Sequence, residues 1–266
     1  RLAENIQQKI FTRSSFEFAY RFPKIKSESL QNIYPPELAN RFFDTITVQK
    51  GVSKILLDLP SATVQIILGV ILLSLYHPFF ILYGLLLVLL LYLVFKFTAA
   101  KGLKTSLDES KNKYQVAYWI QEIARNLNSF KISGRSRLAI QKNDRLTASY
   151  LKEREDHFGI LKIQYIKLIV FKVLVAGGLL AIGGILVLNQ QMNIGQFVAA
   201  EIIILLIISS VEKLIRGLED VYDTLTSLEK LGQVVDKPLE AFENQNSVDA
   251  SNGIKLELKD VAFEPE

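Results

Sequence analysis

Two long apolar blocks most constrain what this chain can fold into. The first runs from about Leu56 to Phe95 and the second from about Ile166 to Leu214. A single helix needs roughly 20 apolar residues to cross the hydrocarbon core of a bilayer, and each block has about twice that number. Each block is therefore predicted to form two membrane spans joined by a short turn.

Turn-forming segments divide both blocks. Residues 76–78 (Tyr-His-Pro) interrupt the first block, and residues 189–193 (Asn-Gln-Gln-Met-Asn) interrupt the second. Pro78 suits the first turn of a helix, where its missing N–H leaves no hydrogen bond unmade. The predicted spans are therefore about residues 55–76, 79–97, 166–188 and 194–215.

The distribution of Lys and Arg predicts how these spans are oriented. Neither turn contains a Lys or Arg, whereas residues 1–54 and 96–154 contain many. Because positively charged loops stay on the cytoplasmic side, both turns are expected outside and both ends of the chain inside. The net charge of +4 fits such membrane flanks better than nucleic-acid binding. The expected location is a cell membrane, with a bacterial inner membrane preferred.

Composition excludes several kinds of chemistry. The chain has no Cys, so disulfides, thiol catalysis and cysteine metal sites are excluded. His77 and His157 are its two histidines and lie far apart in sequence, so no metal site is predicted. The segment Arg1–Lys9 is polar, which argues against a cleavable signal peptide. The first residue is not Met, which suggests that the chain is a piece of a longer protein.

The spans are predicted to continue as helices into the cytoplasm. No Pro occurs between Phe79 and Lys237, so nothing there forces a helix to end. A continuous helix over Phe79–Tyr118 would be about 60 Å long, twice the roughly 30 Å hydrocarbon thickness. Small residues at 177, 181 and 184 are predicted to pack against another helix. A short heptad repeat of apolar residues, which would pack against a partner helix, is predicted at Val211, Leu214, Leu218, Val221, Leu225 and Leu228.

The pattern changes near the C-terminus. Residues 238–253 are rich in polar residues and are predicted to form a linker. Residues 254–258 (Ile-Lys-Leu-Glu-Leu) alternate strictly between apolar and charged, which is typical of a strand. A second domain is therefore expected to begin over residues 254–266.

Several motifs, in order along the chain, resemble the ABC exporters of the six-helix class, which include haemolysin, bacteriocin, lipid and multidrug exporters. Residues 36–44 (Pro-Glu-Leu-Ala-Asn-Arg-Phe-Phe-Asp) and the segment from Glu122 to Lys131 resemble the two coupling regions of that family. Residues 193–200 (Asn-Ile-Gly-Gln-Phe-Val-Ala-Ala) resemble the start of its sixth helix, and residues 258–263 (Leu-Lys-Asp-Val-Ala-Phe) the first strand of its nucleotide-binding domain.

This resemblance implies an all-α membrane domain over residues 1–237, followed by the start of an α/β ATPase domain. The family's first helix and the outer half of its second have no counterpart here. The implied partners are the lipid bilayer, nucleotide-binding domains and a second transporter half, as a homodimer or a heterodimer. The residues implied to couple the membrane domain to the ATPase are Glu37, Arg41, Phe42, Phe43, Asp44, Glu122 and Lys131.

The function expected from the resemblance is that of the transmembrane subunit of an ATP-driven exporter. No Gly-x-x-x-x-Gly-Lys-Ser/Thr phosphate loop occurs in the chain, so no catalytic residue and no cofactor are assigned to it. ATP and Mg²⁺ are expected in the parent protein, an ATP-dependent translocase. Pro265 stands where the family usually has an adenine-stacking aromatic residue, which favours the alternative of a non-transporting scaffold or degenerate partner subunit. A four-helix channel is a third alternative.

Glu201 is the strongest single candidate for a residue that lines the translocation path. It lies in an otherwise apolar run, roughly 10 Å from the turn at residues 189–193, at a rise of about 1.5 Å per residue. Acidic side chains at membrane depth are costly and usually face a cavity or a partner. A helix–helix hydrogen bond without substrate contact is the alternative. Lys172 is the nearest basic residue in sequence, but it is expected closer to the cytoplasm.

Overall fold

The computed structural model describes residues 1–31, 33–134 and 137–240, and every regular element in these ranges is a helix. An isolated antiparallel bridge joins Ile25 to Leu239. The α-helices are α1 (Leu2–Arg21), α2 (Pro35–Asn40), α3 (Asp44–Ser74), α4 (Phe79–Arg125), α5 (Leu127–Ile132), α6 (Leu138–Leu188) and α7 (Ile194–Val235). Short 3₁₀ helices are η1 (Phe22–Lys24), η2 (Ser27–Leu30) and η3 (Arg41–Phe43).

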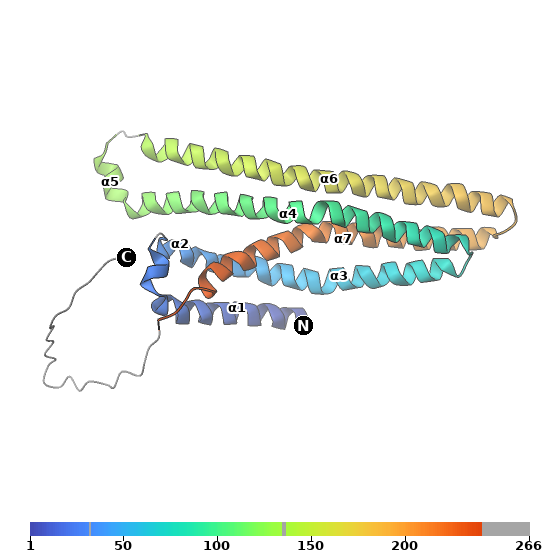
Figure 1. The fold of residues 1–266 in the computed structure, drawn as a ribbon, viewed down its shortest axis with the longest axis horizontal. Helices are drawn as coiled ribbons and strands as arrows, with labels where there is room; N and C mark the ends of the chain where they lie inside the picture. Colours follow the sequence, from blue (N-terminus) through green and yellow to red (C-terminus); the bar gives the residue numbers. More distant parts are fainter. Residues whose placement is uncertain (32, 135–136, 241–266) are drawn as a thin grey trace, which may run out of the picture.

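Four long helices lie side by side in an elongated bundle (Figure 1), in which α3 packs along α7 and α4 along α6. The turns α3–α4 and α6–α7 lie at one end of the bundle, and α2 and α5 lie at the other. Helix α6 has 51 residues, which at about 1.5 Å per residue is more than twice the thickness of a hydrocarbon core. The prediction of an all-α bundle with long helix extensions is confirmed.

Local chemistry explains why the helices break between the long elements. The backbone N–H of Phe79 donates to Nδ1 of His77 at 3.1 Å, at the start of α4. Asn193 and Gln196 form a reciprocal capping box that begins α7, with Asn193 Oδ1 2.7 Å from the Gln196 backbone nitrogen. Gln190 has a φ of 58°, a left-handed conformation typical of tight turns. Both breaks lie in the segments that the sequence identifies.

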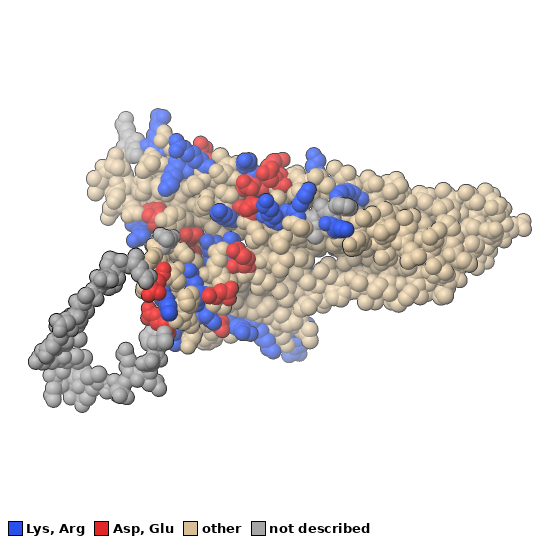
Figure 2. All heavy atoms as spheres, viewed as in Figure 1, with Lys and Arg blue, Asp and Glu red and all other residues tan. Residues whose placement is uncertain are grey.

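Three helical stretches have the length and composition to cross a membrane: Pro35–Ser74, Leu138–Leu188 and Ile194–Val235. A shorter apolar helix, Phe79–Leu93, lies in the second predicted span. On the face drawn in Figure 2, charged side chains gather over the end that carries α2 and α5, and none is visible at the end that carries the two turns. On this face, the end with the two turns is apolar and the end with α2 and α5 is charged, and we call them the apolar end and the charged end.

The main core joins all four long helices near the apolar end. Leu168, Ile204 and Ile207 are almost completely buried, and Phe80 and Leu87 of α4 contribute to the same cluster. Because lipid tails are as apolar as these side chains, close van der Waals packing between the helices holds this core together. A smaller cluster at the charged end packs α1 against α2, α3 and α7, with buried residues Phe18, Leu38, Val48, Leu231 and Val234.

The contacts within the chain bear on two packing predictions. A Cβ added at Gly177 or Gly184 would meet nothing within 4 Å, whereas one added at Gly183 would lie 2.7 Å from Phe197 Cε2. The glycine that allows α6 to approach α7 is therefore Gly183, one position along the helix from Gly184. Along the predicted heptad of α7, Val211 and Leu218 are buried within the chain, whereas Leu225 and Leu228 are 44% and 45% exposed.

Small polar residues are also buried in the C-terminal part of α7, which we call its stem. Thr226 and Ser227 are buried, and Ser106 Oγ of α4 lies 2.9 Å from Thr226 Oγ1. Gln164 Nε2 of α6 donates to the Tyr222 hydroxyl at 2.9 Å. Hydrogen bonds between helices thus add to the apolar packing of the stem, and hydropathy patterns do not reveal them. The predicted linker beyond residue 240 and the predicted strand at residues 254–258 lie outside the described residues.

Candidate coupling segments and membrane charges

The segment from Pro35 to Phe43 forms a compact two-helix elbow between α1 and α3. Pro35 occupies the first turn of α2, where no backbone hydrogen bond is lost. Leu38 is 2% exposed and anchors the elbow in the smaller apolar cluster. Glu37 Oε1 accepts a hydrogen bond from Arg41 Nη2 at 3.0 Å, so these two predicted coupling residues pair with each other.

Arg41 is buried by its contact with α4. Its guanidinium carbon lies 3.8 Å from the centre of the Tyr114 ring, and only 8% of the residue is exposed. The Tyr114 hydroxyl donates a hydrogen bond to the carboxylate of Asp44, the first residue of α3. Burial raises the pKa of Asp44, although the hydrogen bond from Tyr114 and the charges of Lys113 and Arg41 act in the opposite direction. Burial also raises the pKa of the Tyr114 hydroxyl.

This Arg41–Tyr114–Asp44 cluster joins three elements, η3, α4 and α3. Arg41 and Asp44 were both predicted to act in coupling, and the structure places them inside the protein rather than on its surface. Tyr114 was missed from sequence. The burial of these side chains favours a role in holding the elbow on α4.

Phe42 and Phe43 have opposite surroundings. The Phe42 ring packs 5.4 Å from Phe11 and 5.7 Å from Phe18 of α1, measured between ring centres. Phe43 is 65% exposed and contacts the Phe42 ring at its edge. Of the two predicted contact residues, Phe43 is therefore the one that the elbow presents to the outside.

The second predicted coupling segment spans the end of α4 and the short helix α5. Glu122 holds this corner locally: Asn126 Nδ2 donates to its Oε2 at 3.3 Å, and Arg125 lies 3.6 Å from its Oε1. Lys131 lies in the last turn of α5 and is exposed. Ile132 is 86% exposed at the end of the same helix. α5 thus presents an apolar and a basic side chain to the outside.

Aromatic residues that the sequence reading missed connect the two segments through α4. The Tyr34 ring, just before α2, packs 6.0 Å from Tyr118, and the Arg125 guanidinium lies 4.6 Å from the Tyr34 ring centre. Trp119 packs 6.0 Å from Phe130 of α5. The Trp119 indole N–H donates to the Ala139 carbonyl of α6 at 3.0 Å.

The sequence did contain a signal for this face of α4. Tyr114 and Tyr118 are four residues apart and so share one face of the helix. In the structure Ile120 is 54% exposed and Leu127 is 48% exposed, whereas Tyr114 and Trp119 are buried.

Glu201 lies on α7, between the turn at residues 189–193 and the middle of the helix. It is partly buried, and it makes no hydrogen bond or ion pair with any of the residues that the structure describes. Lys172 of α6 pairs with Glu212 of α7 instead, and Arg216 lies 2.5 Å from the same carboxylate. The expectation that Lys172 does not pair with Glu201 agrees with this arrangement.

The family of the chain follows from a comparison with protein-family models. The model described as ABC transporter transmembrane region matches residues 28–211, more than two thirds of the chain. The chain belongs to this family. The matched stretch includes α2 to α6, both predicted coupling segments and Glu201. A comparison with curated proteins found no match.

Membership of the ABC transmembrane family, together with the apolar helices, makes the chain a multi-pass membrane protein and a membrane subunit of a transporter. Within the described ranges, no group of three or more His, Asp or Glu side chains could hold a metal ion. The full sequence contains no phosphate loop.

Proposed function

We propose that this ABC membrane domain forms the translocation pathway of an ATP-driven exporter and is coupled to ATPase domains through η3 and α5. The observation that carries the proposal is the shared position of these two segments. Both lie at the charged end of the bundle, opposite the two turns, and both expose apolar side chains there: Phe43 on η3 and Ile132 on α5.

Helix α4 is the proposed connection between ATPase and pathway. Its first turns contribute Phe80 and Leu87 to the main core among the membrane-length helices. Its last turns contact the first elbow through Tyr114 and Tyr118, and α5 through Trp119. A long helix transmits a displacement at one end to the other, so a push on either segment would reach the core.

The membrane charges support a pathway along α7. Glu201 has a carboxylate without a partner among the described residues, and Glu212 lies about three turns further along the same helix, held by Lys172. Unpaired acids at membrane depth are costly and are retained where they face a cavity, water or a substrate. We assign Glu201 to the wall of the pathway, with Gln as the substitution that removes its charge at similar size.

The proposed assembly contains two such halves and two ATPase domains with bound ATP and Mg²⁺. ATP binding would close the inner side of the pathway and hydrolysis would reopen it, which is alternating access. Both ends of the chain would face the cytoplasm of the cell whose membrane holds the transporter.

The test is transport by the full-length protein in proteoliposomes, with a fluorescent lipid, a short peptide and a cationic dye as probes. The proposal predicts ATP-dependent movement of at least one probe and a matching stimulation of ATPase activity. In the Glu201→Gln variant both should fall, while basal ATPase activity stays. Basal ATPase activity that no probe stimulates, with no transport, would instead support a membrane scaffold.

A further inference from the structure

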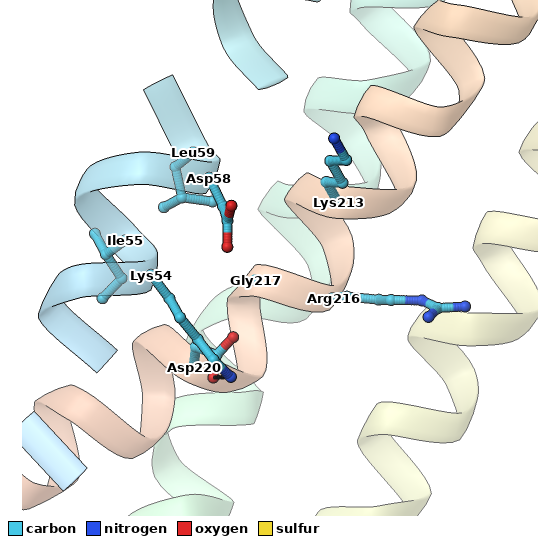
Figure 3. A pocket seen from close by; sticks show the side chains of 8 residues that line it. All are labelled: Lys54, Ile55, Asp58, Leu59, Lys213, Arg216, Gly217 and Asp220. Atoms are coloured by element: carbon cyan, nitrogen blue, oxygen red, sulfur yellow. Dashed lines mark hydrogen bonds and ion pairs between the residues drawn. The ribbon is translucent and has the colours of Figure 1, made fainter. Parts of the chain in front are cut away.

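A pocket of about 240 Å³ lies between α3 and α7, where both helices leave the apolar part of the bundle (Figure 3). On α3 it lies at the start of the predicted span 55–76, and on α7 at the end of the predicted span 194–215. This level corresponds to the interface between hydrocarbon and water, where phospholipid headgroups are found. The pocket lies apart from both coupling segments.

The charges in the pocket are only partly paired. Lys54 Nζ lies 2.7 Å from Asp220 Oδ1, and this ion pair closes the cytoplasmic end of the pocket. Arg216 extends away from the pocket and lies 2.5 Å from Glu212. Asp58 and Lys213 make no hydrogen bond or ion pair with a described residue. One carboxylate and one ammonium group therefore remain available to a ligand.

The two available charges lie at different levels along the bundle. Figure 3 shows Lys213 above Gly217 on α7, which along the chain is the side of the turn at residues 189–193, and the Asp58 carboxylate at a lower level, between α3 and α7. A ligand entering from the membrane would thus meet the positive group first and the negative group next. In a zwitterionic phospholipid the phosphate lies nearest the acyl chains and the ammonium lies further out, in the same order.

The pocket also offers an apolar wall. Ile55 and Leu59 line it on α3, and Leu59 Cδ2 lies 2.9 Å from the position of a Cβ on Gly217, so the glycine lets the two helices approach. Leu56 and Leu57 beside them are 51% and 58% exposed. These side chains suit the two methylene carbons that separate the phosphate from the ammonium.

We propose that this pocket binds the headgroup of a zwitterionic phospholipid with a primary ammonium. Lys213 contacts the phosphate, and Asp58 accepts hydrogen bonds from the ammonium. Charge-assisted hydrogen bonds of this kind need N–H donors, which the quaternary ammonium of choline lacks. A glycerol headgroup offers no cation to Asp58. Ethanolamine lipids should therefore be preferred over choline and glycerol lipids.

The experiment is native mass spectrometry of the full-length protein, exchanged into an equimolar mixture of ethanolamine, choline and glycerol phospholipids with the same acyl chains. We expect the protein to retain about five times more ethanolamine lipid than choline lipid. A partly exposed ionic contact contributes about 1 kcal/mol, which corresponds to about a fivefold difference in affinity. Added inorganic phosphate should not displace the lipid, because phosphate alone does not use Asp58. Displacement by phosphate would show a simple anion site and overturn the proposal.

Matched variants separate the two contacts. Asp58→Asn should abolish the preference for ethanolamine over choline, and Lys213→Gln should lower the retention of both lipids. Asp144→Asn and Lys152→Gln, exposed residues of the α6 stem, are the controls for charge and should leave both unchanged. Equal retention of ethanolamine and choline lipids by the unmodified protein, or an unchanged preference in Asp58→Asn, would contradict the proposal. Neither result depends on transport or ATPase activity.

Discussion

Phe42 and Phe43 show how much the role of a residue depends on its immediate surroundings. The two are neighbours in sequence and chemically identical, yet Phe42 packs against α1 while Phe43 is 65% exposed. The sequence predicts that at least one of the pair contacts another domain, and it cannot say which one. The choice depends on the turn of η3, which sets the direction of each side chain.

This difference gives a matched pair of substitutions in the full-length protein. We expect Phe43→Ala to change stability by less than about 0.5 kcal/mol, as exposed substitutions usually do, and to lower the transport obtained per ATP hydrolysed. Phe42→Ala should cost about 2 kcal/mol, because its ring is packed between Phe11 and Phe18. Thermal unfolding in detergent and the ratio of transport to ATP hydrolysis are the measurements. An unchanged ratio in Phe43→Ala would remove Phe43 from the coupling site.

The Arg41–Tyr114–Asp44 cluster predicts a pH-dependent effect. Tyr114→Phe removes the hydrogen bond that favours the charged form of Asp44, so the pKa of Asp44 rises further above its usual value. A folded-state pKa above the unfolded one means that stability falls as pH rises through that pKa. We expect Tyr114→Phe to cost about 1–3 kcal/mol near neutral pH and less in acid, where the carboxyl carries its proton.

The measurement is thermal unfolding in detergent over a series of pH values. Tyr118→Phe is the control, since the Tyr118 ring packs against Tyr34 and its hydroxyl has no hydrogen-bond partner in the described ranges. That variant should show a small effect that does not vary with pH. A Tyr114→Phe effect of equal size at all pH values would contradict the assigned hydrogen bond.

At the scale of helices, Gly183 predicts how α6 and α7 are held together. A Cβ there would lie 2.7 Å from the Phe197 ring, whereas one at Gly177 meets open space. Gly183→Ala should therefore destabilise the protein by about 1–3 kcal/mol, and Gly177→Ala should be neutral or stabilise it by up to about 1 kcal/mol. Thermal unfolding of both variants is the measurement. Equal effects would mean that these helices pack in another register.

The fluorescence of Trp119 reports on the contact between α4 and α5, because Trp119 is the single tryptophan of the chain. It is 7% exposed and packs against Phe130. We expect Phe130→Ala to shift the tryptophan emission to longer wavelength and to increase quenching by a soluble quencher, as the indole gains contact with water. Phe158→Ala, an exposed aromatic residue of α6, should change neither. Unchanged emission in Phe130→Ala would contradict the docking of α5.

The elements were more predictable from sequence than the contacts between them. Pro78 and the polar run at residues 189–193 end helices through local chemistry, so the breaks can be found from the chain alone. The stem contacts cannot, because Ser106, Thr226 and Gln164 are polar residues buried by hydrogen bonding between helices. Hydropathy assigns such residues to the surface. Only the three-dimensional arrangement of α4, α6 and α7 brings them together.

At the scale of the whole molecule, the charged residues and the two turns lie at opposite ends of the bundle. The two turns occupy one end of the bundle, and η3, α5 and most of the charge visible in Figure 2 occupy the other. An ABC membrane domain with this arrangement can place a pathway between its membrane helices and two docking segments on one side. The transport role, the lipid site and the coupling contacts all require that the two ends face opposite sides of the membrane.

Cysteine labelling tests this requirement directly, because the chain contains no Cys of its own. Single substitutions His77→Cys and Asn193→Cys at the two turns, and Ser133→Cys after α5, would be treated in intact cells with a thiol reagent that does not cross membranes. We predict that the thiols introduced at the two turns react in intact cells, and that the thiol introduced after α5 reacts only after permeabilisation. Labelling of the Ser133→Cys variant in intact cells, or protection of either turn until permeabilisation, would contradict the account.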